Sequence, residues 1–387
     1  MKILFVADGR SPTAINWMRY FCEAGDEVVL VSTFACEPNL ALQKKIVLPV
    51  AFSSVKKPTS SSKANFLFGA STLKIRTLIR QWLGPASISK AARVLRSIIQ
   101  QEKPDLVHAM RIPFEGMVAA DGYAGVPLVI SVWGNDFTLH AESNKMMRHY
   151  TEWAMRVADG VQADCHRDIA LARQYGLDAG KPTLVVPGSG GVRADIFYPA
   201  ADESNLSLVV NPRGFRAYVR NDVFFKAIPL VLRDVPDARF VCPGMDAEPQ
   251  VMEWVEQLGV GHAVDLLPPL SQPDLANLYR RSKVVVSPTI HDGTPNSLIE
   301  ALACGCYPVA GDLESIREWI QDGVNGALVN PGSPESVARA IVRGLQDGEL
   351  RARSREINLR LINERAEYRS GMEKVRQFYQ RVMRSTT

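Results

Sequence analysis

The stretch 283–330 constrains the fold of this chain more than any other. A β-branched run at 283–288 ends at a proline, which is typical of a buried parallel strand. A polar turn at 291–297 leads into a helical apolar face that ends at Gly305, and a second strand begins at Tyr307. This order predicts a βαβ unit, in which the loop leaving the first strand is where a ligand binds.

The length and composition of the chain indicate a soluble protein of two domains. A chain of 387 residues predicts two domains of roughly 150–200 residues each. With 46% hydrophobic and 22% charged residues the composition is ordinary, and a net charge of +4 argues against a dedicated nucleic-acid binder. The six cysteines lack metal-ligand or disulfide spacing, so we expect a reducing cytoplasm. We expect neither a signal peptide nor a membrane-spanning segment.

The first half of the chain reads as a doubly wound parallel sheet. An apolar run at 2–7 opens into the loop 8–12, which contains Gly9 and lies at the carboxyl edge of the sheet, but no dinucleotide G-x-G-x-x-G follows. Further strands are predicted at 27–32, 46–52, 106–109, 127–132, 160–164 and 183–186. A polar stretch at 199–205 reads as the linker between the domains.

The segment 63–84 mixes apolar and aromatic residues with Lys74, Arg76 and Arg80. It has two interpretations. One is an amphipathic helix that packs on the sheet, and the other is a basic, aromatic surface that contacts an anionic membrane or a lipid-linked acceptor.

Two positions in the first half are candidates for a site. His108 ends one predicted strand, although a lone histidine there is as easily a packing residue. The group Trp133-Gly134-Asn135-Asp136 follows another strand at the same sheet edge, and four polar or aromatic residues there make the better candidate.

The second half opens with a strand at 206–210 and then a cationic loop. Arg213, Arg216 and Arg220 fall within eight residues, between this strand and a predicted helix at 223–232. A guanidinium fork suits phosphate oxygens, and the start of the helix adds partial positive charge. The loop is therefore a candidate phosphate-binding site.

These residues resemble the family 4 glycosyltransferases, which have the α/β fold called GT-B: two Rossmann-like, doubly wound domains that face each other across a cleft. The family carries two acidic residues separated by seven others, usually both glutamate. Here they are Asp292 and Glu300, in a series that continues through Gly305 and 308–309, and 292–297 reads as a subgroup variant of the motif. The resemblance spans nearly the whole chain, with its most specific motifs in the second half.

The resemblance implies a domain for each half and a site for the donor. Residues 1–198 would bind the acceptor, 206–365 the nucleotide-sugar, and 366–387 would cross back to the first domain. Glu300 would bind the ribose hydroxyls, and a carboxylate can accept hydrogen bonds from both hydroxyls of a diol. Arg213 would clamp the diphosphate, with Arg220 or Arg216 as its partner. The implied catalytic residues are Arg213, Arg220, Asp292 and Asp136, and the implied donor-binding residues are Gly9, Arg216, Gly244, Leu267, Pro268, Gly293, Thr294, Asn296, Ser297, Leu298 and Glu300.

One position departs from the family. Many members have a histidine before the glycine where this chain has Trp133-Gly134. Indole offers only an N–H donor and cannot act as a base. Asp136 and His108 are the candidates to take the place of that histidine near the sugar or acceptor.

The function expected from this resemblance is retaining transfer of a hexose from a nucleotide-diphosphate sugar to a saccharide or lipid-linked acceptor, without metal or cofactor. Closure of the two domains would exclude water, and the leaving phosphate would deprotonate the acceptor. We expect a cytoplasmic protein of bacterial polysaccharide or glycolipid synthesis, peripheral to the inner membrane and without nucleic-acid partners. A catalytically silent nucleotide-sugar-binding protein and, less favoured, a sugar-nucleotide epimerase are the alternatives.

Overall fold

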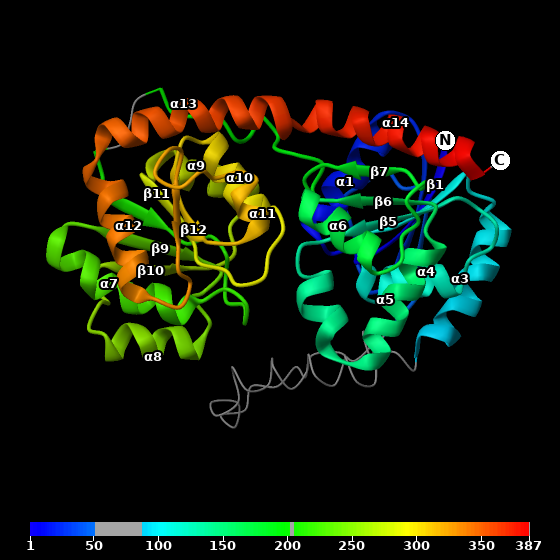
Figure 1. Ribbon diagram of the computed structural model, residues 1–387, viewed down its shortest axis with the longest axis horizontal. Coiled ribbons are helices and arrows are strands. Elements are labelled where there is room, and N and C mark those ends of the chain that lie inside the picture. Colours follow the sequence, from blue (N-terminus) through cyan, green and yellow to red (C-terminus); the bar gives the residue numbers. More distant parts are fainter. Residues whose placement is uncertain (51–86, 202–204, 387) are drawn as a thin grey trace. The chain divides into compact units, whose positions relative to one another are not determined.

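The computed structural model describes residues 1–50, 87–201 and 205–386. These residues form two compact units, each with its own parallel sheet. Unit 1 comprises the described residues 1–50, 87–191 and 369–386, and unit 2 comprises 192–201 and 205–368. The predicted fold class, two Rossmann-like α/β domains, is confirmed, and Figure 1 shows the order of the elements along the chain.

Unit 1 contains a sheet of seven parallel strands in the order β3-β2-β1-β4-β5-β6-β7. The strands are β1 (Lys2–Ala7), β2 (Glu27–Ser32), β3 (Lys44–Val47), β4 (Leu106–Ala109), β5 (Leu128–Val132), β6 (Gly160–Ala163) and β7 (Thr183–Val185). Strand β1 pairs with β2 on one side and β4 on the other, so the strand order reverses between β1 and β4. Ligands of doubly wound sheets bind at such a switch point.

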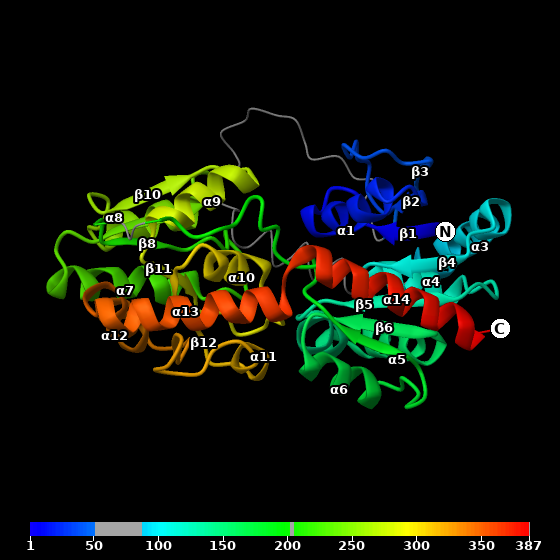
Figure 2. The ribbon, with the colours of Figure 1, turned by 90° about the horizontal axis from the view of Figure 1, so that it is seen from above.

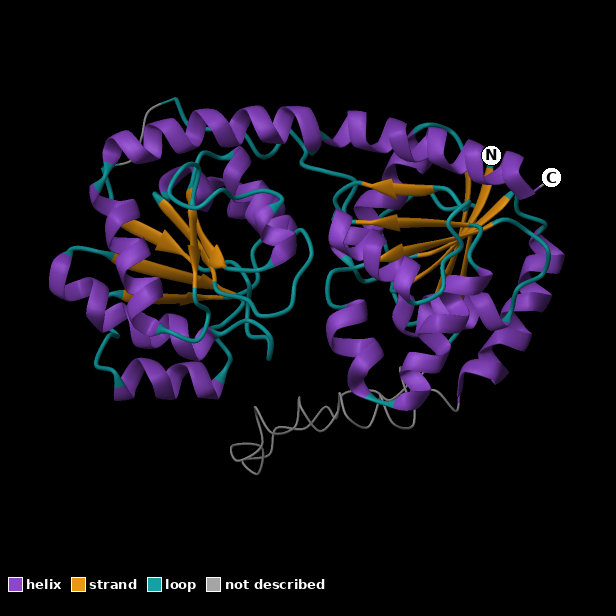
Figure 3. Ribbon diagram, viewed as in Figure 1, coloured by secondary structure: helices purple, strands orange, loops and turns teal. Residues whose placement is uncertain are grey.

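Helices surround this sheet, as Figure 3 shows. They are α1 (Pro12–Glu23), α3 (Ile88–Glu102), α4 (Met117–Asp121), α5 (Lys145–Val157), α6 (His166–Gln174) and α14 (Tyr368–Thr386), with short turns η3 (Ile112–Gly116), η4 (Asp136–His140) and η5 (Ala141–Ser143). None of the helices in the described part of the chain could cross a bilayer. The third strand, predicted at 46–52, is found at Lys44–Val47, and residues 48–50 are not in a strand. Residues 51–52 of that prediction and the segment 63–84 lie outside the described residues.

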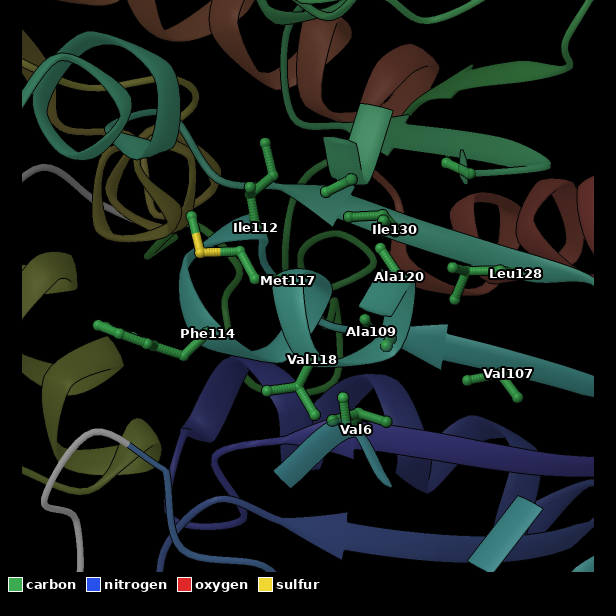
Figure 4. Close-up of a cluster of buried hydrophobic side chains, with 14 of the residues drawn as sticks. Val6, Val107, Ala109, Ile112, Phe114, Met117, Val118, Ala120, Leu128 and Ile130 are labelled. Atoms are coloured by element: carbon green, nitrogen blue, oxygen red, sulfur yellow. The ribbon is translucent and has the colours of Figure 1, made fainter. Parts of the chain in front are cut away.

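The core of unit 1 forms where α4 packs on the central strands. Strands β4 and β5 are buried along their whole length, which explains their continuous apolar sequences. Figure 4 shows Met117 and Ala120 of α4 beside Ala109 and Ile130 of these strands, all of them buried. A rigid sheet of this kind fixes the loops that leave its carboxyl edge.

Unit 2 has six parallel strands in the order β10-β9-β8-β11-β12-β13. They are β8 (Leu208–Val210), β9 (Arg239–Pro243), β10 (Val264–Leu267), β11 (Val284–Ser287), β12 (Tyr307–Gly311) and β13 (Ala327–Val329). Numbered from β8 this is the order 3-2-1-4-5-6 of the Rossmann fold. The predicted βαβ unit is present, with β11 and β12 paired in parallel around the helix between them.

The helices of unit 2 begin where the sequence supplies caps. Ser333 accepts a hydrogen bond from the Ser336 N–H and Pro334 takes the first position of its helix, which is a favoured start. The helices are α7 (Asn221–Asp234), α8 (Pro249–Gln257), α9 (Gln272–Arg281), α10 (Asn296–Ala303), α11 (Glu314–Arg317), α12 (Pro334–Gln346) and α13 (Gly348–Arg365). Helices α7 and α12 lie side by side against the sheet (Figures 1 and 2).

The division between the units lies earlier in the chain than the predicted linker at 199–205. The chain passes from unit 1 to unit 2 between Gly191 and Val192. The Val192 N–H donates to the Ala366 carbonyl and the Tyr368 N–H donates to the Val192 carbonyl, at 2.7 and 3.1 Å. These backbone bonds place Val192 in unit 2, and a polar composition alone could not reveal them. Helix α14 from residue 369 onward packs with unit 1.

A buried chain of hydrogen bonds ties α14 to the sheet of unit 1. Trp17 Nε1 donates to the Tyr379 hydroxyl (2.9 Å), which lies 2.6 Å from His108 Nδ1. His108 Nε2 lies 2.8 Å from Ser131 Oγ, which donates to Gln162 Oε1 at 2.6 Å. Because Ser131 uses its proton on Gln162, His108 carries its own proton on Nε2 and accepts from Tyr379 at Nδ1. The histidine is neutral, and burial lowers its pKa to about 3.

This chain of hydrogen bonds predicts that acid lowers the stability of unit 1. Between a pKa of about 3 in the folded state and an ordinary value of about 6.5 in the unfolded state, the unfolded chain binds more protons, so stability falls as the pH drops through this range. His108→Gln should lower the melting temperature at pH 7.5 but reduce its further fall between pH 7.5 and 5. His262→Gln, at an exposed histidine, is the control. Melting curves of His108→Gln with the full wild-type pH dependence would contradict this reading.

Candidate functional site

The switch point of unit 2 brings two loops together, one after β8 and one after β11. Residues 219 and 289 form an antiparallel bridge between them. The Ile290 N–H donates to the Tyr218 carbonyl, and the Arg220 N–H donates to the Pro288 carbonyl, at 3.0 and 3.2 Å. Because β8 and β11 are neighbours in the sheet, the cationic loop at 213–220 and the polar turn at 291–297 belong to the same site.

The guanidinium of Arg213 is the centre of this site. Its Nη2 donates to Asp292 Oδ2 at 2.5 Å and its Nη1 to Ser297 Oγ at 3.1 Å. The side chain of Arg213 is 8% exposed and that of Asp292 is 15% exposed. Solvent screens such a pair less than a surface ion pair. Arg213 is therefore a fixed positive charge at the carboxyl edge of the sheet.

Buried polar contacts hold both loops in place. Asn211, which is fully buried, donates to Asn221 Oδ1 at 3.0 Å. On the other loop the Asp292 carbonyl accepts from Ser315 Oγ at 2.7 Å, and Thr294 Oγ1 accepts from Trp319 Nε1 at 2.8 Å. These contacts orient Arg213 and Asp292 before any ligand arrives.

Glu300 lies one turn into α10, and its side chain is half-buried. Within the described part of the chain its carboxyl group has no hydrogen-bond partner. Burial raises the pKa of Glu300 to about 7, and the positive charge of Arg213 offsets this only in part. A half-buried carboxyl group in this setting has the capacity to accept hydrogen bonds from a ligand.

Two more polar atoms at this site lack a partner among the described residues, Arg213 Nε and the Tyr279 hydroxyl. Tyr279, on α9, is fully buried, and its pKa is raised by that burial and then by the charge of Glu300. An unsatisfied buried donor costs about 1–3 kcal/mol, which a ligand or water oxygen can recover. The sequence did not predict a role for Tyr279, because nothing in the sequence of α9 indicates that this side chain lies near Glu300.

The other two arginines of the cationic loop have partners of their own. Arg220 pairs with Asp222, with Nη2 to Oδ2 at 2.8 Å, and Arg216 donates to the Tyr218 hydroxyl at 2.9 Å. The choice of Arg220 over Arg216 as a second diphosphate ligand therefore stays a prediction.

The remaining donor-binding candidates of unit 2 occupy the same edge of the sheet. The Gly244 N–H donates to the Leu267 carbonyl at 2.7 Å, and Gly244 has a φ of +74°, which favours glycine. Pro268, which follows Leu267, is exposed. At the start of α10, Asn296 and Ser297 are half-buried, whereas the side chain of Leu298 packs in the core. The buried residues of the loop before α10 are Gly293, Thr294 and Pro295.

In unit 1, Gly9 leaves β1 in a buried loop. Its N–H donates to Ser32 Oγ at 3.1 Å, and a Cβ at this position would lie 2.4 Å from Cys36 Sγ. Only glycine fits there without displacing its neighbours. Trp133 is half-buried at the end of β5, and the carbonyl of the buried Gly134 accepts from Arg167 Nη2 at 2.9 Å.

His108 and Asp136, the candidates to take the place of the missing histidine, are both buried among partners of their own. His108 is fully buried in the chain of hydrogen bonds described above. Asp136 is fully buried as well, and its Oδ2 accepts from the N–H groups of Ile112 and Trp133 at 3.0 and 3.1 Å. Its Oδ1 accepts from Arg111 Nη2 at 2.9 Å. Asp136 thus fixes the loops after β4 and β5, and a role of either side chain near the sugar or acceptor stays a prediction.

One group of possible metal ligands occurs among the described residues. Donor atoms of Asp164, Cys165 and Asp168 lie within 4.8 Å of one another, and all three residues are buried. Arg167 Nη2 donates to Asp168 Oδ1 at 2.7 Å, and burial raises the pKa of the Cys165 thiol. A paired carboxylate and a protonated thiol make this an ion-pair cluster of the fold.

Comparisons with known families match both halves of the chain. Residues 11–188 match the model described as "Glycosyl transferase 4-like domain", and residues 214–347 match "Glycosyl transferases group 1". The second match contains the paired acids Asp292 and Glu300.

Named relatives and solved structures agree with these matches. The chain is 29% identical over 215 residues to D-inositol 3-phosphate glycosyltransferase of Streptosporangium roseum, covering 50% of this chain and 48% of that protein. It thus spans about half the length of this curated relative. Sucrose-phosphate synthase from Thermosynechococcus elongatus is similar over 100% of both chains, with a TM-score of 0.78 and 14% identity. Anabaena Alr3699/HepE, solved with UDP-glucose, covers 97% of this chain and 98% of its own, with a TM-score of 0.74 and 15% identity.

The raised pKa of Glu300 predicts a pH-dependent cost to stability. Between the ordinary value near 4.5 and about 7 the folded state binds more protons than the unfolded state, so stability falls as the pH rises through this window. Above pH 7 the cost is complete and amounts to at most about 3 kcal/mol. Glu300→Gln should therefore melt several degrees above the wild type at pH 8 and close to it at pH 4.5. Glu356→Gln, at an exposed glutamate, is the control, and an equal shift of Glu300→Gln at both pH values would contradict the assignment.

Proposed function

Because both halves of this chain are glycosyltransferase domains, we propose that the protein transfers a sugar from a nucleotide-diphosphate sugar to an acceptor hydroxyl. One observation in unit 2 carries the proposal. A buried guanidinium, Arg213, and the carboxyl group of Glu300, which has no hydrogen-bond partner among the described residues, lie together at the switch point of a Rossmann sheet. A nucleoside diphosphate offers the complementary groups, two phosphates and a ribose diol.

The two residues have different tasks. Arg213 binds the diphosphate and stabilises the negative charge that grows on it as the bond to the anomeric carbon breaks. Charge stabilisation of this preorganised kind is usually the largest catalytic contribution. Glu300 accepts hydrogen bonds from the ribose hydroxyls, which act on the carboxylate form and lower its pKa on binding.

Asp292 is the third member of this group. It holds Nη2 of Arg213, so its carboxylate orients the guanidinium. We propose a retaining reaction in which the leaving phosphate accepts the proton of the acceptor hydroxyl on the same face of the sugar. In that mechanism Arg213 supplies the cation at the diphosphate, and the reaction needs no metal ion.

The pathway and location that we propose are those of a hexosyltransferase of bacterial polysaccharide or glycolipid assembly at the cytoplasmic face of the inner membrane. The support is the family match of both halves of the chain. The acceptor that we propose is a saccharide or a lipid-linked sugar. Contact of 63–84 with an anionic membrane stays a hypothesis, for which co-sedimentation with liposomes is the test.

A nucleotide-sugar-binding protein without transfer is the second candidate. It is favoured by Trp133 in the place of a histidine, and by the burial of both His108 and Asp136. Release of nucleotide from a radiolabelled donor, with and without acceptors, separates the two. If the protein binds the donor but releases no nucleotide with any acceptor, it is a binding protein without transferase activity.

Thermal shift with UDP-, GDP- and ADP-sugars should reveal the donor, since a ligand at 100 times its Kd stabilises the folded state by about 2.7 kcal/mol. With that donor, Arg213→Ala and Glu300→Gln should each weaken binding at least tenfold in titration calorimetry. Arg360→Gln and Glu356→Gln, which alter an exposed pair on α13, should bind as the wild type does. Unchanged affinity in Arg213→Ala, with circular dichroism showing a folded protein, would refute the site.

The retaining mechanism predicts the stereochemistry of the product. With an α-linked donor, proton NMR of the freshly formed product should show the small anomeric coupling of an α-glycoside. A β-glycoside as the first product would show inversion, and the proposed role of the leaving phosphate would then be wrong.

A further inference from the structure

The cationic loop of unit 2 carries less positive charge than its three arginines alone would give. Carboxylates match two of them: Asp292 pairs with Arg213, and Asp222 pairs with Arg220. The third, Arg216, is exposed and donates to a neutral hydroxyl. A loop that is largely neutralised in this way suits a ligand of modest negative charge better than a strongly charged one.

Asp292 is the carboxylate that lies where the diphosphate is proposed to bind. It shares one guanidinium with a neutral partner: Arg213 Nη2 donates to Asp292 Oδ2 at 2.5 Å, and Nη1 donates to Ser297 Oγ at 3.1 Å. Each Nη atom has two hydrogens, so both keep one for a phosphate. A phosphate oxygen that binds Nη2 lies no more than about 5.5 Å from Asp292 Oδ2, because two hydrogen bonds through one nitrogen join them.

The backbone contacts of Asp292 hold it at this position. Its carbonyl accepts from Ser315 Oγ at 2.7 Å. The loop before it is joined to the cationic loop by the bridge between residues 219 and 289. The Asp292 side chain is only 15% exposed, so solvent screens its charge less than it would on the surface. A second anion on Arg213 therefore meets a fixed negative charge.

The charge of the nucleotide changes during the proposed reaction. In the donor the sugar esterifies the terminal phosphate, so each of the two phosphates carries one negative charge. Transfer breaks the bond between the anomeric carbon and the phosphate oxygen, and this oxygen keeps the electron pair. The proton of the acceptor hydroxyl passes to the leaving phosphate and from there to solvent, because the second pKa of such a phosphate is about 6. The donor is thus a dianion, and the product nucleoside diphosphate is a trianion.

We propose that Asp292 discriminates between donor and product, because its carboxylate repels the third negative charge of the nucleoside diphosphate and so favours exchange of product for new donor. Like charges about 5.5 Å apart in a partly buried site repel each other by more than the thermal energy. Asp292 is then a specificity-determining residue as well as the residue that orients Arg213. The inference rests on the proposed function, because it assigns a further task at the same site.

Two nucleotides without a sugar differ by this one charge: a nucleoside diphosphate and the methyl ester of its terminal phosphate. Contacts between Asp292 and a donor sugar play no part in the comparison. UDP, GDP and ADP, each with its methyl ester, are titrated into the full-length protein in a calorimeter at pH 8. At this pH the diphosphate is a trianion, the ester is a dianion, and Glu300 is mostly ionised in every sample.

Variants at the two partners of Arg213 test the role of charge. Asp292→Asn removes the charge but keeps an oxygen that can accept from Nη2, and it should shift the ratio of the two Kd values at least fivefold in favour of the diphosphate. Ser297→Ala removes the neutral partner of the same guanidinium, so it should change both Kd values by the same factor. Asp292→Ser covers the case in which circular dichroism shows Asp292→Asn to be unfolded.

A purely orienting role for Asp292 gives a different result. Both ligands would then lose affinity equally in Asp292→Asn and the ratio would stay as in the wild type, which would overturn the inference. An equal shift of the ratio in Ser297→Ala would overturn it too, because the discrimination would then not depend on charge.

Arg213→Ala separates this inference from the proposed function. If binding of the diphosphate depends on Arg213 but the ratio is unchanged in Asp292→Asn, the donor site stands and the inference fails. A shifted ratio in a protein that transfers no sugar from any donor would remove the transfer and leave the discrimination by Asp292 standing. Absence of binding by all three diphosphates would overturn both.

Discussion

The parallel pairing of β8 with β11 is the constraint on which the functional site depends. Residues 209 and 210 lie beside 284 and 285, so the loops after the two strands leave the sheet side by side. Arg213 on one loop and Asp292 on the other then pair at 2.5 Å although 79 residues separate them. The same strand order in unit 1 opens a cavity beside Asp8 and Arg111. One topology, used twice, thus places a switch point in each unit.

Function and stability oppose each other at the proposed donor site. Arg213 has an N–H with no partner in the described part of the chain, and Glu300 has a carboxyl group whose pKa burial raises to about 7. Both features weaken the folded protein without ligand and strengthen its attraction for a group that carries phosphate and hydroxyl oxygens. The buried histidine of unit 1 is the contrasting case. Each nitrogen of His108 has a partner, and the residue connects α14 to the sheet.

The sequence predicts features that depend on residues close together in the chain, and it does not predict those that depend on residues far apart. The strands, the βαβ unit around α10 and the cationic loop are local patterns, and most appear within a residue or two of their expected bounds. The burial of Asp136 depends on Arg111, 25 residues away, and that of His108 on Tyr379, 271 residues away. No local pattern announces such contacts. The run 111–115 does have a local signal, because it directly follows a strand at the switch point.

Hydrogen–deuterium exchange with the donor nucleotide tests the central claim most directly, because it reports where in the chain the ligand acts. With a saturating nucleoside diphosphate, peptides that cover 211–222 and 288–300 should exchange more slowly, and Arg213→Ala should abolish the protection. Protection confined to other segments, or protection that persists undiminished in Arg213→Ala, would contradict the account.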